Sequence, residues 1–212
     1  MAKNYAKVEP DKYTIWQELG HYFIIFFILY PYFKIFHRIS IEGRENIPKG
    51  KSILVASNHI SNFDPVIVSL AVLRPVAYMA KRELFFVPVI SQLIQFLGAF
   101  SVNRGKLEVS TIKSAKAVLK TNWLLGIFPE GTRIKTGKIG SVHKGFGYLA
   151  KATGAEILPL GISGSNKAFG KIKVKIGKPI PTPENPEEAV TKWGKAIEGL
   201  TGIEFDESIQ SS

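Results

Sequence analysis

The chain has 212 residues, of which 45% are hydrophobic, so it can bury the core of one domain of ordinary size. It contains no cysteine, which excludes disulfides and thiolate metal sites. The formal net charge is +11, and residues 51–150 carry most of the excess, with thirteen Lys/Arg against four Asp/Glu. Such an excess favours anionic partners: nucleic acid, acidic lipid, phosphorylated substrates or an acidic carrier protein.

The N-terminal part of the chain is rich in aromatic and apolar residues. Residues 22–33 read YFIIFFILYPYF, and a helix of that length spans about 18 Å, against about 30 Å for a hydrocarbon core. Aromatic rings favour the headgroup boundary, and the cations Lys34 and Arg38 follow the run. We predict that residues 10–38 form one helix, or two that meet at Pro31, lying in one leaflet. The alternative is a buried core helix of a soluble protein.

Strands and helices alternate along the rest of the chain. Strands are predicted over residues 53–57, 76–80, 99–102, 124–129, 156–162 and 171–180, and helices over 65–73, 83–97, 106–121, 144–153 and 186–200. This order predicts an α/β fold, in which one domain over residues 39–212 has a largely parallel or mixed central sheet flanked by helices. A membrane-associated helical segment over residues 1–38 precedes it. Sites of such sheets gather on the loops that follow the strands.

The loop SNHISNFDP follows the first strand and holds His59 and Asp64. A carboxylate bonded to one ring nitrogen of a histidine fixes its tautomer and leaves the other nitrogen as a base. The alternative is a helix N-cap by Asp64, followed by Pro65 at the first helical position, with an unrelated surface histidine. Ser57 and Ser61 are close by, but no G-x-S-x-G elbow exists, so a base acting on a substrate hydroxyl fits better than a covalent intermediate.

A second polar loop, FPEGTR, follows the strand at 124–129. Gly131 allows close approach of a ligand, Thr132 offers a hydroxyl, and Arg133 can bind a phosphate through two parallel hydrogen bonds. Glu130 would repel phosphate, so we expect it to orient an arginine or to bond a hydroxyl. The alternative is a plain turn with a surface arginine. Arg104, in the turn after residues 99–102, is a second phosphate ligand, and Lys81, Arg82 and Lys144 are further cationic candidates.

Four blocks in order make this sequence resemble the 1-acylglycerol-3-phosphate acyltransferase family of glycerolipid synthesis, bacterial type. They are N-H-x4-D from Asn58 to Asp64, GAFSVNRG at 98–105, FPEGTR at 128–133, and ILPLGI around Pro159. The resemblance implies transfer of an acyl chain from a thioester to the 2-hydroxyl of lysophosphatidic acid, giving phosphatidic acid in phospholipid biosynthesis.

The same resemblance implies roles for the residues of the blocks. His59 would be the general base and Asp64 its orienting partner, while the glycerol phosphate would bind to a set of residues on two loops. That set is Arg104, Glu130, Gly131, Thr132 and Arg133. Pro159 would belong to the acyl-donor side.

Further expectations concern partners. No metal or cofactor is expected, because no second histidine or cysteine stands at ligand spacing from His59 and a hydroxyl nucleophile needs only a base. The co-substrate would be acyl-ACP or acyl-CoA, and the protein would lie on the cytoplasmic face of the cell membrane. Three alternatives stay open: acylation of glycerol 3-phosphate or another lysolipid, non-catalytic binding of anionic lipid, and nucleic-acid binding, for which no motif of a known module appears.

Overall fold

A computed structural model describes residues 13–50, 52–102, 108–134, 137–140 and 142–206. They form a seven-stranded sheet in the order β1-β7-β6-β2-β5-β3-β4. The strands are β1 (Ser40–Glu42), β2 (Ile53–Ser57), β3 (Val76–Lys81), β4 (Phe100–Val102), β5 (Leu124–Ile127), β6 (Glu156–Ser163) and β7 (Lys173–Ile176). The five from β6 to β4 are parallel to one another, and β7 runs antiparallel to β6 and parallel to β1. The predicted mixed α/β fold is confirmed.

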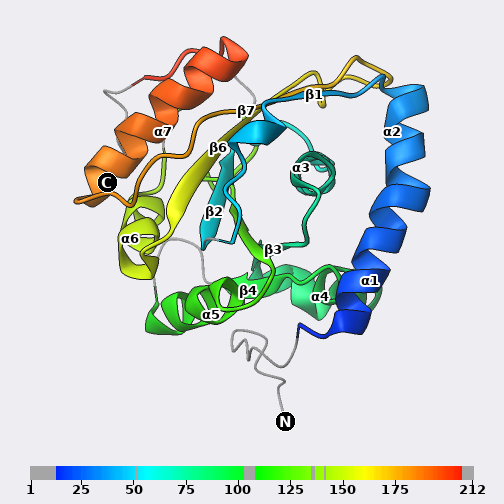
Figure 1. The fold of residues 1–212 in the computed structure, drawn as a ribbon, viewed down its shortest axis with the longest axis horizontal. Coiled ribbons are helices and arrows are strands. Elements are labelled where there is room, and N and C mark those ends of the chain that lie inside the picture. Colours follow the sequence, from blue (N-terminus) through cyan, green and yellow to red (C-terminus); the bar gives the residue numbers. More distant parts are fainter. Residues whose placement is uncertain (1–12, 51, 103–107, 135–136, 141, 207–212) are drawn as a thin grey trace.

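Helices cover both faces of the sheet (Figure 1). They are α3 (Asp64–Val72), α4 (Pro88–Phe96), α5 (Val109–Leu119), α6 (Lys144–Thr153) and α7 (Pro186–Thr201). The strand β2 is buried along its whole length, as its continuous apolar run predicts for a central parallel strand. Leu54 and Ala56 point into a core shared with α5, α6 and α7, while Ile53 and Val55 point into one shared with α3.

The N-terminal helix runs from Ile15 to Phe36 along the outer side of α3 (Figure 1). It consists of α1 (Ile15–Phe23), a π-helical segment (Ile24–Leu29) and α2 (Tyr30–Phe36), with Pro31 near the start of α2. Ile25 and Phe33 are buried in the core of α3. The helix therefore packs on the domain through one side.

The length of this helix corrects one expectation. Its 22 residues span about 33 Å, long and apolar enough to cross a membrane, so the prediction of a run too short to cross is wrong on length. The extra length comes from the turns around Trp16 and Leu19 before the aromatic run. Trp16 and Phe27 are 78% and 72% exposed, so an apolar face points away from the domain.

Candidate active site

The loops predicted to carry chemistry lie at one edge of the sheet. Because β2, β5, β3 and β6 are parallel, their carboxyl ends share this edge. The loop with His59 follows β2, the turn with Glu130 follows β5, and Ser165 follows β6. Arg104 comes after β4 but lies outside the described residues.

His59 and Asp64 are in direct contact. The two atoms His59 Nδ1 and Asp64 Oδ2 are 2.9 Å apart. Asp64 is fully buried, and Oδ2 also accepts the backbone N–H of Ile60 (2.7 Å) and of Ser61 (2.6 Å). Ser165 Oγ donates to the other oxygen, Oδ1, at 2.6 Å. These bonds compensate the carboxylate for the loss of water and hold it in one orientation.

The alternative, in which Asp64 caps the following helix, is wrong. Asp64 is the first residue of α3 and Pro65 the second, and the residue at the cap position is Phe63, without a side-chain bond. The carboxylate turns back toward the amides of the preceding loop instead of the helix. The geometry is that of an acid orienting a histidine.

Ser165 is a site residue that the sequence analysis missed. It lies 101 residues from Asp64 in the chain, and its hydroxyl is buried against the carboxylate. The signal was a serine two residues after the end of β6, at the same edge of the sheet as His59. Spacing alone gives no reason to pair it with Asp64.

Aromatic rings support the imidazole. The ring of Phe128 stacks on His59 with 4.2 Å between centroids, and Tyr78 stacks on the other side of Phe128 at 5.7 Å. The Tyr78 hydroxyl donates to the carbonyl of Pro65, which ties this stack to the start of α3. With Nδ1 bonded to Asp64, Nε2 is the ring nitrogen that can serve a substrate, and no described residue bonds it.

Glu130 connects the FPEGTR turn to His59. Its Oε1 accepts the backbone N–H of His59 at 3.2 Å, and the N–H of Ile134 donates to the His59 carbonyl at 2.7 Å. The FPEGTR loop thus hydrogen-bonds both the N–H and the carbonyl of His59. The expected bond of Glu130 to an arginine or a hydroxyl does not occur among the described residues; Oε2 is buried there without a partner.

Burial raises the pKa of Glu130 from its ordinary 4.5 to about 8. The folded protein therefore binds more protons at Glu130 than the unfolded chain does between these values, so this one group contributes a free energy of unfolding that falls as pH rises from 4.5 to about 8. The slope approaches about 1.4 kcal/mol per pH unit. Glu130→Gln should flatten it, as measured by urea unfolding across this range. Glu187→Gln, at an exposed site on α7, controls for the loss of one carboxylate; equal slopes in wild type and Glu130→Gln would contradict the shift.

Gly131 has a structural reason to be glycine. Its φ is +67°, and a Cβ there would lie 2.3 Å from the ring of His143. The turn therefore packs against His143, which stands just before α6. The predicted close approach of a ligand to this backbone stays a prediction.

The cationic candidates surround this turn. Thr132 and Arg133 are exposed directly after Glu130, and Lys144 is exposed at the first position of α6. Lys81 lies at the carboxyl end of β3 and forms an ion pair with Glu83 at 3.3 Å. Thr132 and Arg133 share the turn whose Glu130 bonds the backbone of His59, and the binding roles of these side chains stay predictions.

Backbone amides of a loop beside a catalytic histidine are a common source of hydrogen-bond donors to a developing oxyanion, so free N–H groups of the His59 loop would be candidates for this role. Most of these amides already donate hydrogen bonds within the protein. His59 N donates to Glu130, Ile60 N and Ser61 N donate to Asp64, and Phe63 N donates to Ser61 Oγ. These four amides are therefore poor candidates for the oxyanion.

Asn58 and Pro159 are buried and contribute to the packing between β2 and β6. The Asn58 amide bonds the backbone of Ile162 twice, as donor at 2.9 Å and as acceptor at 2.7 Å, which fixes the start of the loop to β6. Pro159 is buried in β6, opposite Ala56. Neither side chain lies at the exposed edge, and the link of Pro159 to an acyl donor stays a prediction.

Known proteins resemble this chain in sequence. A model of the Acyltransferase family matches residues 38–163. The 1-acyl-sn-glycerol-3-phosphate acyltransferase of Bacillus subtilis is 30% identical over 148 residues, which cover 67% of this chain and 73% of that protein. The chain belongs to the acyltransferase family.

Other members extend the comparison. The protein of the same name from Borreliella burgdorferi is 33% identical over 136 residues, 63% of this chain and 54% of that protein. The chain therefore spans about half the length of that relative. It spans 45% of the length of the 1-acyl-sn-glycerol-3-phosphate acyltransferase LPAT1 of Arabidopsis thaliana. The crystal structure of the LPA acyltransferase PlsC from Thermotoga maritima superposes with a TM-score of 0.63 over 89% of this chain and 95% of that chain, at 24% identity. At this identity the likeness shows the fold.

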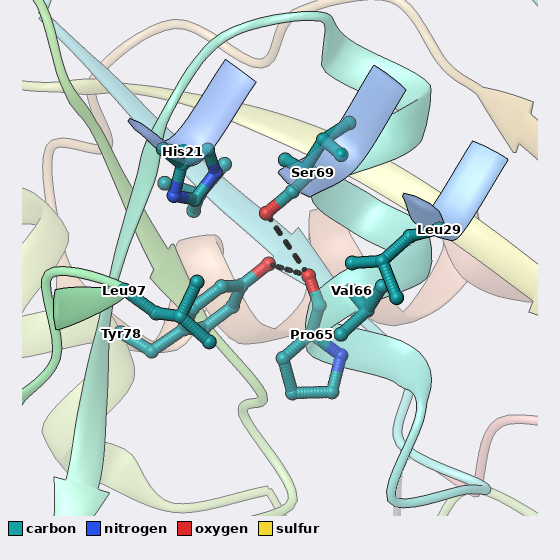
Figure 2. Close-up of a pocket in the computed structure, with 9 residues that line it drawn as sticks. His21, Leu29, Pro65, Val66, Ser69, Tyr78 and Leu97 are labelled. Atoms are coloured by element: carbon teal, nitrogen blue, oxygen red, sulfur yellow. Dashed lines mark hydrogen bonds between the residues drawn. The ribbon is translucent and has the colours of Figure 1, made fainter. Parts of the chain in front are cut away.

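The family member has a small apolar cavity between the N-terminal helix, α3 and β3 (Figure 2). Its volume is about 40 Å³, far below the several hundred Å³ typical of small-molecule sites. Ser69 Oγ and Tyr78 Oη point to the same carbonyl, that of Pro65, and close one side of it (Figure 2). The cavity in this conformation cannot hold a whole acyl chain.

Proposed function

We propose that this protein transfers an acyl chain from a thioester to the 2-hydroxyl of 1-acylglycerol 3-phosphate, giving phosphatidic acid. The observation that carries the proposal is the contact of His59 Nδ1 with the buried carboxylate of Asp64, on a loop gripped by the FPEGTR turn. The relatives named for this reaction support the substrate class. Because the Borreliella relative is longer than this chain, which covers 54% of it, the activity of this chain has to be tested directly.

The reaction needs one proton moved twice. His59 Nε2 takes the proton of the acceptor hydroxyl as its oxygen attacks the thioester carbonyl, and Asp64 stabilises the imidazolium that results. The tetrahedral intermediate then collapses, the carbon–sulfur bond breaks, and the imidazolium returns the proton to the leaving thiolate. The ester forms without a covalent enzyme intermediate, so no metal or cofactor is part of the proposal.

The phosphate of the acceptor would bind beside the FPEGTR turn. Arg133 and Thr132 are exposed there, Lys144 lies at the start of α6, and Arg104 would add a further cation. A Glu130 side chain kept neutral by burial would not repel the phosphate. Its role in this proposal is to hold the backbone of His59.

Arg133→Ala should raise KM for the lysophosphatidate about 10–100-fold, because it removes charge-assisted hydrogen bonds worth roughly 1.5–3 kcal/mol. KM for the acyl thioester should change much less. Steady-state kinetics with each substrate varied in turn measures both. Lys138→Ala is the matched control, since Lys138 lies in the same loop but pairs with Glu204 at 2.7 Å. Equal rises in both KM values for Arg133→Ala would move the phosphate site elsewhere.

Membrane attachment is part of the proposal. The exposed aromatic face of the N-terminal helix, next to Lys34 and Arg38, suits the headgroup region of the cytoplasmic leaflet. Burial of Ile25 and Phe33 in the domain favours a helix lying on the bilayer over one crossing it. The proposed acceptor and product both remain in the bilayer, so attachment through the N-terminal helix would keep the His59 site close to the bilayer surface.

The deciding experiment is an in vitro assay of acyl transfer. Lysophosphatidate, glycerol 3-phosphate and a neutral lysolipid should each be offered with acyl-ACP and with acyl-CoA, at several chain lengths. We expect phosphatidate as the main product. Turnover with glycerol 3-phosphate alone would replace the acceptor, and lipid binding without turnover for any pair would leave the non-catalytic alternative.

A further inference from the structure

The segment from Arg82 to Phe96, here called the α4 lip, exposes many large apolar side chains although it lies within the α/β domain. It consists of a 3₁₀ turn (Arg82–Phe86) and α4. Val89 is 78% exposed and Phe86 66%. The other exposed members are Leu84, Val87, Ile90, Leu93 and Phe96. Contiguous apolar surface of this kind marks an interaction site.

The pattern of α4 is the reverse of that of an ordinary surface helix. Its buried residue is Ser91, whose hydroxyl and carbonyl both accept from the side-chain amide of Gln95. The apolar side chains of Val89 and Leu93 point outward instead, and no residue of α4 is charged. A helix that faces water exposes charged side chains, so this face is built for an apolar medium.

The end of the α4 lip is in contact with the N-terminal helix. Gln17 Nε2 donates to the carbonyls of Gln95 (3.0 Å) and Phe96 (2.9 Å), which fixes α1 beside the end of α4 (Figure 1). The Phe96 ring lies so close to Gly20 that a Cβ there would come within 2.6 Å of it. The end of α4 is therefore held against α1, and both helices expose apolar side chains beside this contact, among them Trp16, Leu19 and Leu93.

Charge and position indicate the occupant. Lys81 and Arg82 stand where the lip begins, and the acid beside them, Glu83, forms an ion pair with Lys81. Cations at the border of an apolar and aromatic surface are typical of contact with anionic headgroups. The lip also starts directly at the carboxyl end of β3, the edge of the sheet that carries His59.

We propose that the α4 lip is a second membrane-insertion element, which enters the headgroup region of an anionic bilayer beside the N-terminal helix. A single interfacial helix leaves a protein able to roll about the helix axis. A second inserted element fixes that rotation and holds the edge of the sheet with His59 next to the bilayer. The proposal concerns binding alone and would hold for a lipid-binding protein without turnover.

The absence of cysteine from the chain allows a direct test. Val89→Cys carries an environment-sensitive fluorophore, and Glu187→Cys at the exposed start of α7, on the other side of the sheet, carries the same label as control (Figure 1). On adding phosphatidylcholine–phosphatidylglycerol vesicles, the label at 89 should shift to the blue, brighten several-fold and be quenched by spin-labelled lipid. The label at 187 should not change. No change at 89 on vesicles that bind the protein overturns the proposal.

A second variant tests the contribution to binding. Phe86→Asp combined with Val89→Asp should weaken partitioning to these vesicles by about tenfold or more, since two exposed apolar side chains are lost from the inserted face. Both side chains are exposed, so thermal unfolding should be unchanged. If sedimentation instead shows a dimer that this variant splits, with vesicle partitioning unaltered, the lip is a contact between copies and the proposal fails. An inserted lip in a protein without acyl transfer would leave this inference standing and remove only the proposed function.

Discussion

His59→Ala should lower kcat for acyl transfer by roughly 10²–10⁴-fold, the range that a positioned general base contributes. In the proposed mechanism the imidazole takes the acceptor proton, and its Nδ1 is bonded to Asp64 at 2.9 Å. Alanine removes the proposed base but leaves Arg133 and the exposed apolar side chains of the N-terminal helix and the α4 lip in place. KM for the phosphorylated acceptor and binding to vesicles should therefore change little.

His143→Ala is the matched control for this substitution. His143 is exposed and lies against Gly131, close enough to the same turn to be a rival base. Rates measured at saturating acyl thioester and lysophosphatidate should stay within a few-fold of wild type for this variant. Wild-type turnover of His59→Ala, or a large loss in His143→Ala alone, would assign the base to another residue.

The fold could be predicted largely because its elements carry strong local signals. The run ILVAS is typical of a buried strand and forms β2, and the alternation of lysine with apolar residues around Val174 matches the alternating exposure and burial along β7. The mixed direction of the sheet was left open, since whether β7 runs parallel or antiparallel to β6 depends on a turn without a decisive signal. A helix that includes Pro88 was also predicted from the sequence. The exposure of its apolar side chains was not, because the sequence does not tell which face of a helix packs against a neighbour.

The site could be predicted where its residues are close in sequence. His59 and Asp64 are five residues apart, and the contact follows once the loop curls back. Ser165 and Glu130 could not be placed in this way, since they reach the His59 loop only through the order of the strands. The choice between Asp64 as orienting partner and Asp64 as helix cap was likewise left open by the residues alone: Asp-Pro at a helix start is typical of a cap, and only the folded loop shows two backbone amides bonded to Oδ2.

Asp64→Asn should lower kcat by on the order of 10²–10⁴-fold while the fold persists. The asparagine oxygen can still accept from His59 and the two loop amides, and its NH₂ can donate to Ser165 Oγ, so the cost in stability should be about 1–3 kcal/mol. What is lost is the negative charge that stabilises the imidazolium.

Ser165→Ala is the graded comparison for Asp64→Asn, because it removes one of the four bonds to the carboxylate and keeps the charge. It should lower the free energy of unfolding by about 1 kcal/mol and kcat by less than about tenfold. Kinetics at saturating substrate, with urea unfolding on the same samples, separates the two effects. An Asp64→Asn variant with near wild-type kcat would show that the carboxylate only folds the loop. A Ser165→Ala variant as inactive as Asp64→Asn would show that orientation, more than charge, is what the histidine needs.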